Sequence, residues 1–268
     1  MQQDFGAAHS GSSSAFWRIN GDVAVLLGGG RALLMQLAHP LVARGVAQHS
    51  DFRERPVRRL YRTLTLTSRI AFATGERRRN AVRAINRAHA SVRGPGYSAL
   101  NPQLLLWVHA TLVDSALSAY RTFVAPIPQA DAEAFYQDSI EAGLAVGIPR
   151  QLFPVDLAAF ERYVAAMLQI DAVPTAEAEE LAASVLYPLR WLPRPLLAPI
   201  NQVTAGLLPD GLRRSYGLPP AGLWFRLLRW CLPRLHRWLP GPIWQLPEAR
   251  RARRAPPATP PRPRGVSE

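Results

Sequence analysis

The stretch that decides the fold is RRLYRTLTLTSRIAFATGERRRNAVRAINRAHASVRGPGYSALNPQLLLWVH, residues 58–109. Its segments have the pattern of helices with buried faces, yet they carry polar side chains that can do chemistry. Arg59, Arg62 and Thr63 share one helical face, because they are three and four residues apart. A buried polar side chain needs a partner. Several such residues together therefore predict a functional site rather than only a core.

Helical periodicity continues on both sides of this stretch. We expect helices over residues 56–74, 76–92 and 102–124, and the last is apolar on nearly every face, which predicts a central position. Shorter helices are expected over residues 131–146, 154–170, 175–187, 200–208 and 212–216. No segment sustains the alternation of a strand. The prediction is an all-α fold: a single domain, residues 13–220, of about ten helices around a buried central helix.

A triple glycine, Gly28-Gly29-Gly30, interrupts the apolar stretch from residue 22 to residue 37 and predicts a break between two helices. A phosphate-binding loop is not favoured, because no Gly-Lys-Ser/Thr follows and no parallel-sheet pattern surrounds it. The better interpretation is close packing of the backbone or approach of a ligand to it. His39-Pro40 then ends or kinks the second helix.

Length and composition bound the class of protein. The 268 residues suit one large domain or two small ones, and 48% hydrophobic with 19% charged residues is a globular composition. The net charge is +13, and every basic residue other than histidine is arginine. A coding bias explains the absence of lysine more readily than phosphate binding does. The positive excess favours an anionic lipid or nucleic acid surface, but no nucleic-acid-binding motif is present, so we expect no nucleic acid partner.

The single cysteine, Cys231, excludes intrachain disulfides and cysteine-based zinc or iron–sulfur sites. It fits a reducing compartment, so we expect a cytoplasmic protein, with membrane association left open. Residues 1–12 are expected to be a disordered tail. The N-terminus has no basic region and no early apolar region, so no secretory signal is expected. No uninterrupted apolar run reaches the ~18–20 residues of a spanning helix, so no transmembrane segment is expected.

The C-terminal part changes character from residue 221. Within the segment 221–247, residues 223–244 read LWFRLLRWCLPRLHRWLPGPIW, in which arginines alternate with tryptophans and leucines. This composition is typical of a pair of helices in contact with a membrane surface. The alternative is a helix packed on the body with its arginines in solvent. The remainder, residues 248–268, is rich in proline and arginine, which predicts a disordered tail.

Four of the six histidines lie in the helical body: His39, His49, His89 and His109. Each alone is more often a hydrogen-bonded core residue than a ligand, and no zinc or di-iron spacing is present. Haem iron, however, needs only one neutral imidazole, because the porphyrin supplies four nitrogens. His89 suits that role, and Arg93, one turn further along the expected helix, can pair with a haem propionate. Without a cofactor these residues would form an exposed basic edge.

Several stretches resemble the MpaB-type oxygenases and the catalytic domain of the bacterial rubber oxygenases, or latex clearing proteins. The resemblance covers about residues 20–220 and rests on GGGRALLMQLAHPLVARGVAQHS (28–50), RRLYRTL (58–64), NRAHASVRG (86–94), LNPQLLLWVHATLVDSAL (100–117) and YGLP (216–219). It implies an all-helical fold that holds one b-type haem. Rubber oxygenases cleave an isoprenoid carbon–carbon double bond with dioxygen, and MpaB-type members cleave an isoprenoid side chain.

The resemblance also implies roles for single residues. The haem-ligating histidine matches His89, beside Arg93, and the distal Arg-x-x-Lys-Thr motif matches Arg59, Arg62 and Thr63. Arg62 replaces the motif's lysine. A guanidinium has no free lone pair, so Arg62 cannot ligate iron but can donate hydrogen bonds to the oxygen substrate.

The leading hypothesis is therefore an oxygenase dependent on haem b that acts on an apolar, isoprenoid substrate with dioxygen. One alternative is a non-catalytic helical module that binds a lipid or a protein partner at a membrane surface. Another is a haem-binding sensor or carrier without cleavage activity. A haem spectrum separates the first alternative from the other two hypotheses, and oxygen consumption with a polyene separates the second.

Overall fold

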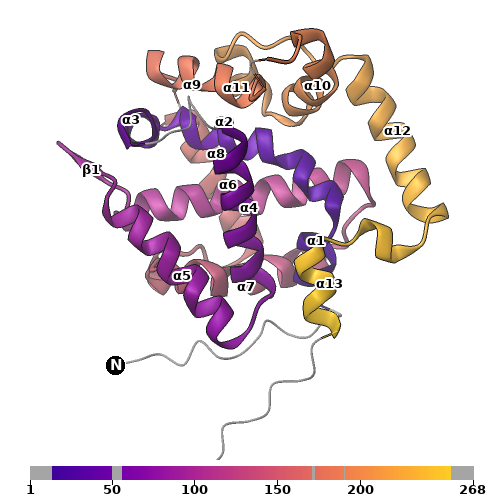
Figure 1. The fold of residues 1–268 in the computed structure, drawn as a ribbon, viewed down its shortest axis with the longest axis horizontal. Helices are drawn as coiled ribbons and strands as arrows, with labels where there is room; N and C mark the ends of the chain where they lie inside the picture. The colour runs from indigo at the N-terminus through magenta and orange to yellow at the C-terminus, as the bar shows by residue number, and fades with distance from the viewer. Residues whose placement is uncertain (1–13, 50–55, 171–172, 190, 255–268) are drawn as a thin grey trace, which may run out of the picture.

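The computed structural model describes residues 14–49, 56–170, 173–189 and 191–254 (Figure 1). These residues form thirteen α-helices, four short 3-10 helices and one two-stranded hairpin. The predicted all-α class is confirmed, with thirteen α-helices in place of about ten. The expected tail over residues 1–12 lies outside the described residues, as does most of the one expected from residue 248.

The helical elements follow one another along the chain with short connections. The α-helices are α1 (Ala15–Asn20), α2 (Gly29–Ala38), α3 (Pro40–His49), α4 (Pro56–Phe72), α5 (Gly75–Ala90), α6 (Pro102–Phe123), α7 (Gln129–Ala145), α8 (Leu157–Ile170), α9 (Ala176–Leu186), α10 (Ala198–Leu207), α11 (Asp210–Ser215), α12 (Leu223–Trp238) and α13 (Pro247–Arg254). The 3-10 helices are η1 (Val23–Gly28), η2 (Arg150–Leu152), η3 (Arg194–Leu197) and η4 (Gly241–Trp244). The hairpin pairs β1 (Arg93–Gly94) with β2 (Tyr97–Ser98) in antiparallel register.

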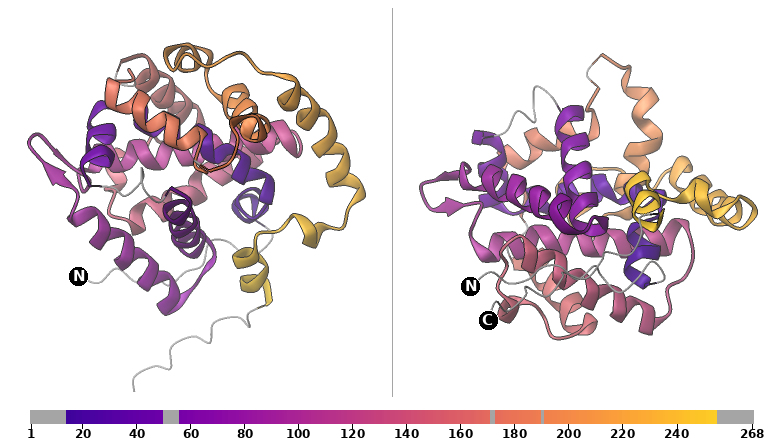
Figure 2. Two further views of the ribbon diagram at one scale, coloured as in Figure 1. Left: turned by 45° about the horizontal axis from the view of Figure 1, so that its top comes forward. Right: turned by 60° about the horizontal axis from the view of Figure 1, so that its bottom comes forward.

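Helix α6 is the predicted central helix. Asn101 caps it by accepting hydrogen bonds from the backbone N–H of Gln103 at 2.9 Å and of Leu104 at 3.4 Å, and Pro102 occupies its first turn. Its side chains are buried on several faces, including Trp107 and Phe123, which have no exposed surface. Helices α1, α2, α7, α8, α10 and α12 pack around it (Figures 1 and 2).

The triple glycine is not the break that the sequence predicts. Helix η1 passes directly into α2 at this point. The close-packing interpretation is confirmed, because a Cβ on Gly28 would lie 2.7 Å from the carbonyl oxygen of Ser115. A Cβ on Gly30 would lie 2.2 Å from Oγ1 of Thr204. The glycines therefore let η1 and α2 approach α6 and α10.

The expected kink at His39-Pro40 is confirmed. Helix α2 ends at Ala38, the Nδ1 of His39 accepts a hydrogen bond from the backbone N–H of Leu41 at 3.2 Å, and α3 begins at Pro40. The chain bends by 102° here. In the described residues no single helix is long and apolar enough to cross a bilayer. The bent pair Val23–Ala38 and Pro40–His49 meets that criterion jointly, by length and composition alone.

Helix α5 ends at Ala90, two residues earlier than predicted. Arg93 consequently lies on β1 and not one helical turn beyond His89. The hairpin forms because Gly96 adopts a φ of +79° in the turn and because Tyr97 folds back over Gly94. The Tyr97 side chain is buried, and its hydroxyl lies 3.0 Å from Nε2 of His49.

Two arginines are buried inside the body of the protein. Arg78 on α5 is 5% exposed, and its Nε donates to the carbonyl of Ile70 at 3.1 Å. Burial lowers the pKa of Arg78, and the charge of Glu141 partly offsets this effect. Arg31 on α2 is 6% exposed and links α2 to both α6 and α10, as its contacts show.

The Arg31 guanidinium makes an ion pair and two hydrogen bonds. Its Nη2 lies 2.6 Å from Oδ2 of Asp114, and its Nη1 donates to Oγ of Ser115 at 2.8 Å. Its Nε donates to the carbonyl of Leu207 at 2.8 Å. A buried cation needs this complete set of partners, because each unpaired donor would cost free energy.

The C-terminal segment runs along one edge of the molecule and returns to the N-terminal helix (Figures 1 and 2). Residues 223–244, expected to form a pair of helices, form α12 and then the short 3-10 helix η4. The backbone N–H of Leu246 donates to the carbonyl of Gly21 at 2.7 Å, and Asp22 forms a β-bridge with Gln245. The expected disorder of residues 248–254 is wrong, because Pro247–Arg254 form α13, with Ala249 buried.

Candidate functional site

The residues predicted to do chemistry lie on α4 and α5, which form a helical hairpin. Gly75, with a φ of +56°, makes the turn between the two helices, which spread apart from it (Figure 1). Arg62 and Thr63 are exposed on α4, and the side chain of Arg59 lies outside the described part of the structure. The structure therefore places the described part of the distal motif at the surface.

His89 lies in the last turn of α5. Its side chain is half-buried and its Nδ1 is fully buried. Asn86 is one turn earlier on the same helix, and its Oδ1 is buried without a hydrogen-bond partner among the described residues. Arg93, expected beside His89, is exposed on β1. His89 and Asn86 are thus the polar side chains of this end of α5 that the body partly encloses.

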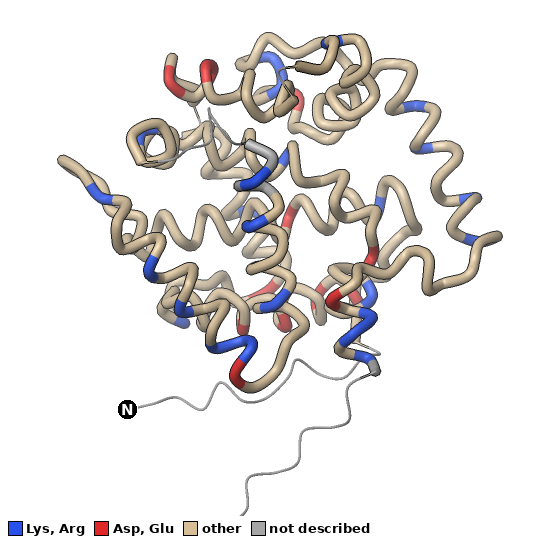
Figure 3. The backbone as a smooth tube through the Cα atoms, viewed as in Figure 1, with Lys and Arg blue, Asp and Glu red and all other residues tan. Residues whose placement is uncertain are grey.

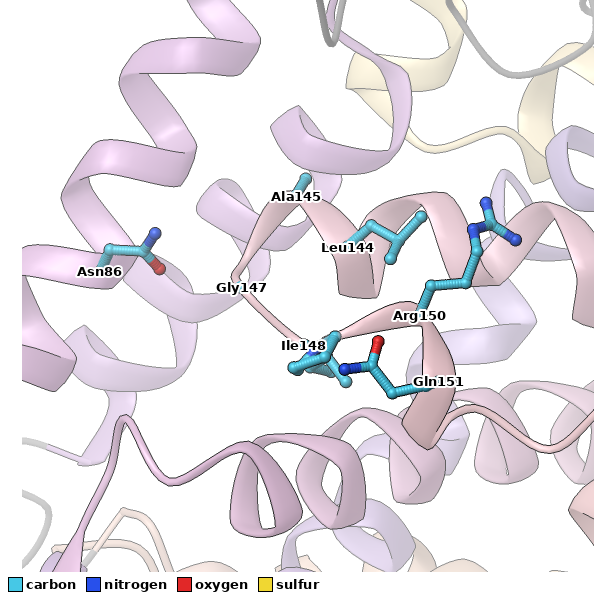
Figure 4. Close-up of a pocket in the computed structure, with 8 residues that line it drawn as sticks. Asn86, Leu144, Ala145, Gly147, Ile148, Arg150 and Gln151 are labelled. Atoms are coloured by element: carbon cyan, nitrogen blue, oxygen red, sulfur yellow. The ribbon is translucent and has the colours of Figure 1, made fainter. Parts of the chain in front are cut away.

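A hollow of about 600 Å³ opens between α5 and the end of α7. Asn86 forms one wall, and the turn after α7 and helix η2 form the other (Figure 4). The lining residues are Asn86, Leu144, Ala145, Gly147, Ile148, Pro149, Arg150 and Gln151. Gly147 has a φ of +101°, so the turn that shapes this wall favours glycine. The volume falls within the range of ligand pockets, about 300–1,000 Å³.

His109 lies on α6, and a chain of apolar contacts connects it to the hollow. Its ring packs edge-on against the ring of Phe153, with 5.8 Å between the ring centroids. Phe153 and Ile148 lie side by side over Gly143, where both occupy the space that a Cβ would need. Ile148 lines the hollow. Although His109 keeps some exposed surface, its Nε2 is buried and has no hydrogen-bond partner in the described structure. Burial lowers the pKa of His109 to about 4, so the ring is neutral at pH 7.

These residues fit a cofactor held by a single imidazole. The described residues contain no group of three or more His, Cys, Asp or Glu side chains that could hold a bare metal ion. A porphyrin would bring its own four nitrogens, so a single half-buried imidazole such as that of His89 would be enough as the protein ligand. Oδ1 of Asn86 and Nε2 of His109 are also buried without a hydrogen-bond partner among the described residues, so each could bond a further group.

Sequence reasoning missed part of this region. Asn86 is one turn before His89, so helical spacing alone could have identified it. The wall from Leu144 to Gln151 carries a visible turn signal in Gly147 and Pro149. Nothing in the sequence shows, however, that this turn faces α5. The two segments are about sixty residues apart in the chain, and only tertiary packing brings them together.

A family model described as the catalytic domain of ER-bound oxygenase mpaB/B' and rubber oxygenase matches residues 17–239. The match covers most of the chain and includes α4, α5 and the hollow. The chain belongs to this family. The MpaB/rubber oxygenase resemblance of the sequence is thereby confirmed, and the chain contains an oxygenase catalytic domain. In general terms, such a domain implies an apolar substrate and dioxygen.

Two relatives show how far along the chain the similarity extends. Uncharacterized proteins of Mycobacterium bovis and of Mycobacterium tuberculosis are each 30% identical to this chain over 228 residues. The alignment covers 79% of this chain and 89% of each relative. No solved structure matches the chain. The family is therefore established at the level of the whole domain.

Proposed function

We propose that this MpaB/rubber oxygenase family member is a haem b-dependent oxygenase that acts on an apolar, isoprenoid substrate with dioxygen. The observation that carries the proposal is the position of His89. It lies within the family-matched range, on a half-buried turn of α5, one helical turn after Asn86, which lines the hollow. Bound haem would supply the activation of dioxygen, which no protein side chain provides.

The side chains around the haem would have distinct roles. His89 would hold the iron through its imidazole. Arg62 would remain protonated and donate hydrogen bonds to the oxygen substrate, and Thr63 would add a hydroxyl donor. Arg59 completes this distal group by the family motif. Arg93 would pair with a haem propionate, for which an exposed guanidinium is suitable.

The neutral state of His109 suits this site. A protonated imidazole would place an uncompensated charge beside apolar walls, whereas the neutral ring leaves its Nε2 available as a donor or acceptor. We further propose a cytoplasmic location with membrane association, since an isoprenoid substrate partitions into lipid.

The decisive experiment is an ultraviolet–visible spectrum of protein produced with a haem supply, together with iron and porphyrin quantification. We expect a Soret band and one haem per chain in the wild type. His89→Ala should lose or shift this band. His236→Gln is the matched control. His236 lies on α12, where it contacts Asp22, and it does not line the hollow. The His236→Gln protein should therefore retain the Soret band.

Three other outcomes are distinguishable. The absence of a band after haem reconstitution would overturn the proposal and leave the non-catalytic lipid- or partner-binding module. A band unchanged in His89→Ala would retain haem but move the ligand, with His109 and His39 next to test. Haem binding without oxygen uptake or carbonyl products from a polyisoprenoid would indicate a sensor or carrier.

A further inference from the structure

Helix α12 has one face packed on the body of the protein. Phe225 is buried, its ring centroid lies 5.9 Å from that of Phe123 on α6, and it fills the space where a Cβ on Gly206 would lie. Leu228 and Leu232, three and seven residues on, are partly buried against the same core. This inner face holds the helix in place and leaves the opposite side of the cylinder uncovered.

The uncovered side carries large apolar residues in helical register. Leu223, Leu227, Trp230 and Trp238 are separated by four, three and eight residues, so they fall on one stripe. Their side chains are exposed, from 42% for Leu227 to 84% for Trp238. An unpartnered apolar stripe of this size on a surface helix marks an interaction site.

Arginines border and cross this stripe. Arg226, Arg229 and Arg237 are exposed between the stripe and the inner face, and within the described residues none of them forms an ion pair. The guanidinium of Arg234 lies over the ring of Trp230, 4.2 Å from its centroid. We call Leu223, Trp224, Leu227, Trp230 and Trp238, with Arg226, Arg229, Arg234 and Arg237, the outer face of α12.

Acidic residues are missing from the whole neighbourhood in sequence. None occurs between Asp210 and Glu248. Figure 3 shows α12 along one edge of the molecule with basic positions spaced along it and no acidic ones. The outer face therefore combines apolar surface with unneutralised positive charge. A protein partner's apolar patch would satisfy the first property alone, and a nucleic acid only the second.

We propose that the outer face of α12 docks in the plane of a lipid bilayer that contains anionic phospholipids. The leucines and tryptophans would enter the boundary between headgroups and acyl chains, where amphipathic aromatic rings are favoured. The arginines would extend to the lipid phosphates. The sixteen residues of α12 would span about 24 Å of that surface.

The helix is already formed and fixed, so docking does not require it to fold. Near its C-terminal end, Nε2 of His236 lies 2.6 Å from Oδ2 of Asp22, and the His236 ring stacks on Trp244 at 4.5 Å between centroids. Binding would therefore not carry the ordering cost that a disordered basic peptide meets at a membrane. This proposal does not depend on haem and is testable on haem-free protein.

The test is co-sedimentation of the full chain with vesicles of phosphatidylcholine, and with vesicles of equal parts phosphatidylcholine and phosphatidylglycerol. We expect binding to the anionic vesicles to be at least about 100-fold tighter, because each arginine near the surface contributes about fivefold and the contributions multiply. The triple variant R226Q/R229Q/R237Q should lose about 100-fold. R79Q/R83Q/R162Q, which removes the same charge from exposed positions on α5 and α8, should lose only a few-fold.

A second variant tests the apolar part of the outer face. In W230S/W238S we expect weaker binding to anionic vesicles and loss of most tryptophan quenching by brominated phospholipid. Trp191→Ser removes an equally exposed tryptophan outside α12 and should retain both signals. Circular dichroism checks that each variant keeps its helical content, and a variant that loses it is replaced by its single substitutions.

Three results would overturn the proposal. The first is equal loss of vesicle binding in the two arginine variants, which would reduce the effect to net charge. The second is a dimer in the wild type that W230S/W238S dissociates while vesicles do not bind, which would make a second copy the occupant. The third is binding to a DNA duplex in preference to anionic vesicles. None of them bears on the Soret band, so this proposal and the haem proposal fail independently.

Discussion

His109 and Arg31 are two polar side chains of the core that differ in whether they have hydrogen-bond partners. Arg31 is surrounded by a carboxylate, a hydroxyl and a backbone carbonyl, so its burial is compensated. His109 has its Nε2 buried without a partner in the described residues and remains neutral instead. Compensation is the usual state of a buried polar group. In the described residues His109 and Asn86 are exceptions to it, as is the fully buried Trp107, whose Nε1 also has no hydrogen-bond partner.

The lowered pKa of His109 makes stability depend on pH. The unfolded chain binds a proton near pH 6.5 and the folded chain only near pH 4, so the stabilisation is present above pH 6.5 and is lost as the pH falls towards 4. Between pH 7 and pH 5 the haem-free wild type should lose about 2 kcal/mol of unfolding free energy through His109, and His109→Gln should not show this part of the loss. Urea denaturation at the two pH values measures it. Equal losses in variant and wild type would contradict the assignment.

Removing Arg31 should be far more costly than removing an exposed arginine. Arg31→Met leaves the Asp114 carboxylate without its cation inside the protein, and we expect a loss of about 3 kcal/mol or more. Arg18→Met is the control: it breaks an exposed ion pair with Asp131 of nearly equal length, 2.7 Å, and should cost less than about 1 kcal/mol. Adding Asp114→Leu to Arg31→Met should recover part of the loss, and urea denaturation reports all four proteins.

Contacts between elements set where the helices lie. The start of α2 approaches α10 because Gly30 has no side chain, and α13 is held against α4 and α5 by one carboxylate. That carboxylate, on Glu248, lies 3.1 Å from Nη2 of Arg77 and 3.8 Å from Nε of Arg69. The returning C-terminal segment is thereby fastened to the two helices that carry the predicted site residues.

Gly29 and Gly30 form a matched pair for testing the contact between α2 and α10. Gly30→Ala would place a methyl group 2.2 Å from Oγ1 of the buried Thr204, and we expect a loss of about 1–3 kcal/mol. Gly29→Ala meets nothing within 4 Å and should be neutral or stabilise the helix by up to about 1 kcal/mol. Thermal unfolding of both variants provides the comparison. Similar losses of stability in the two variants would mean that the packing of Gly30 against Thr204 does not determine the effect of the substitution.

The role of Glu248 can be measured by backbone hydrogen exchange over residues 247–254. Glu248→Gln removes the charge that Arg77 and Arg69 share, and we expect about fivefold faster exchange in α13. Glu161→Gln is the control, since its pair with Arg121 is exposed on both sides and remote from α13. Unchanged exchange in Glu248→Gln would show that the apolar contact of Ala249 alone holds the helix.

At the scale of the whole molecule, the C-terminal segment of the described chain packs against its N-terminal segment, and both belong to one core. Gly21 and Asp22 near the N-terminal helix bond Leu246 and Gln245, and Phe225 and Ala249 belong to the same core as α6. The segment from residue 221 onward therefore covers core surface as well as presenting the outer face of α12.

A chain ending at residue 220 tests this closure. It would uncover Phe123, against which Phe225 packs, and would remove the bonds to Gly21 and Asp22. Losing a buried phenylalanine alone typically costs about 3–5 kcal/mol. We expect this shortened chain to unfold at a clearly lower urea concentration than the full chain, or to be insoluble. The single substitution Phe225→Ala keeps the full length and should reproduce a large part of the loss; an unchanged urea midpoint in both would show that residues from 221 onward do not stabilise the body.

The sequence alone was sufficient for the helical class, the central helix, the kink at His39-Pro40 and the family. These features depend on residues within one or two turns of each other, such as the Asn101 cap followed by Pro102, or on short motifs. Only the tertiary structure decided the partners of Arg31, the helical state of α13, and the hollow between Asn86 and the turn after α7. The exposure of Arg62 and Arg93 was decided there as well. Each of these depends on which distant segments meet, and hydrophobic periodicity specifies that a face is buried without specifying what covers it.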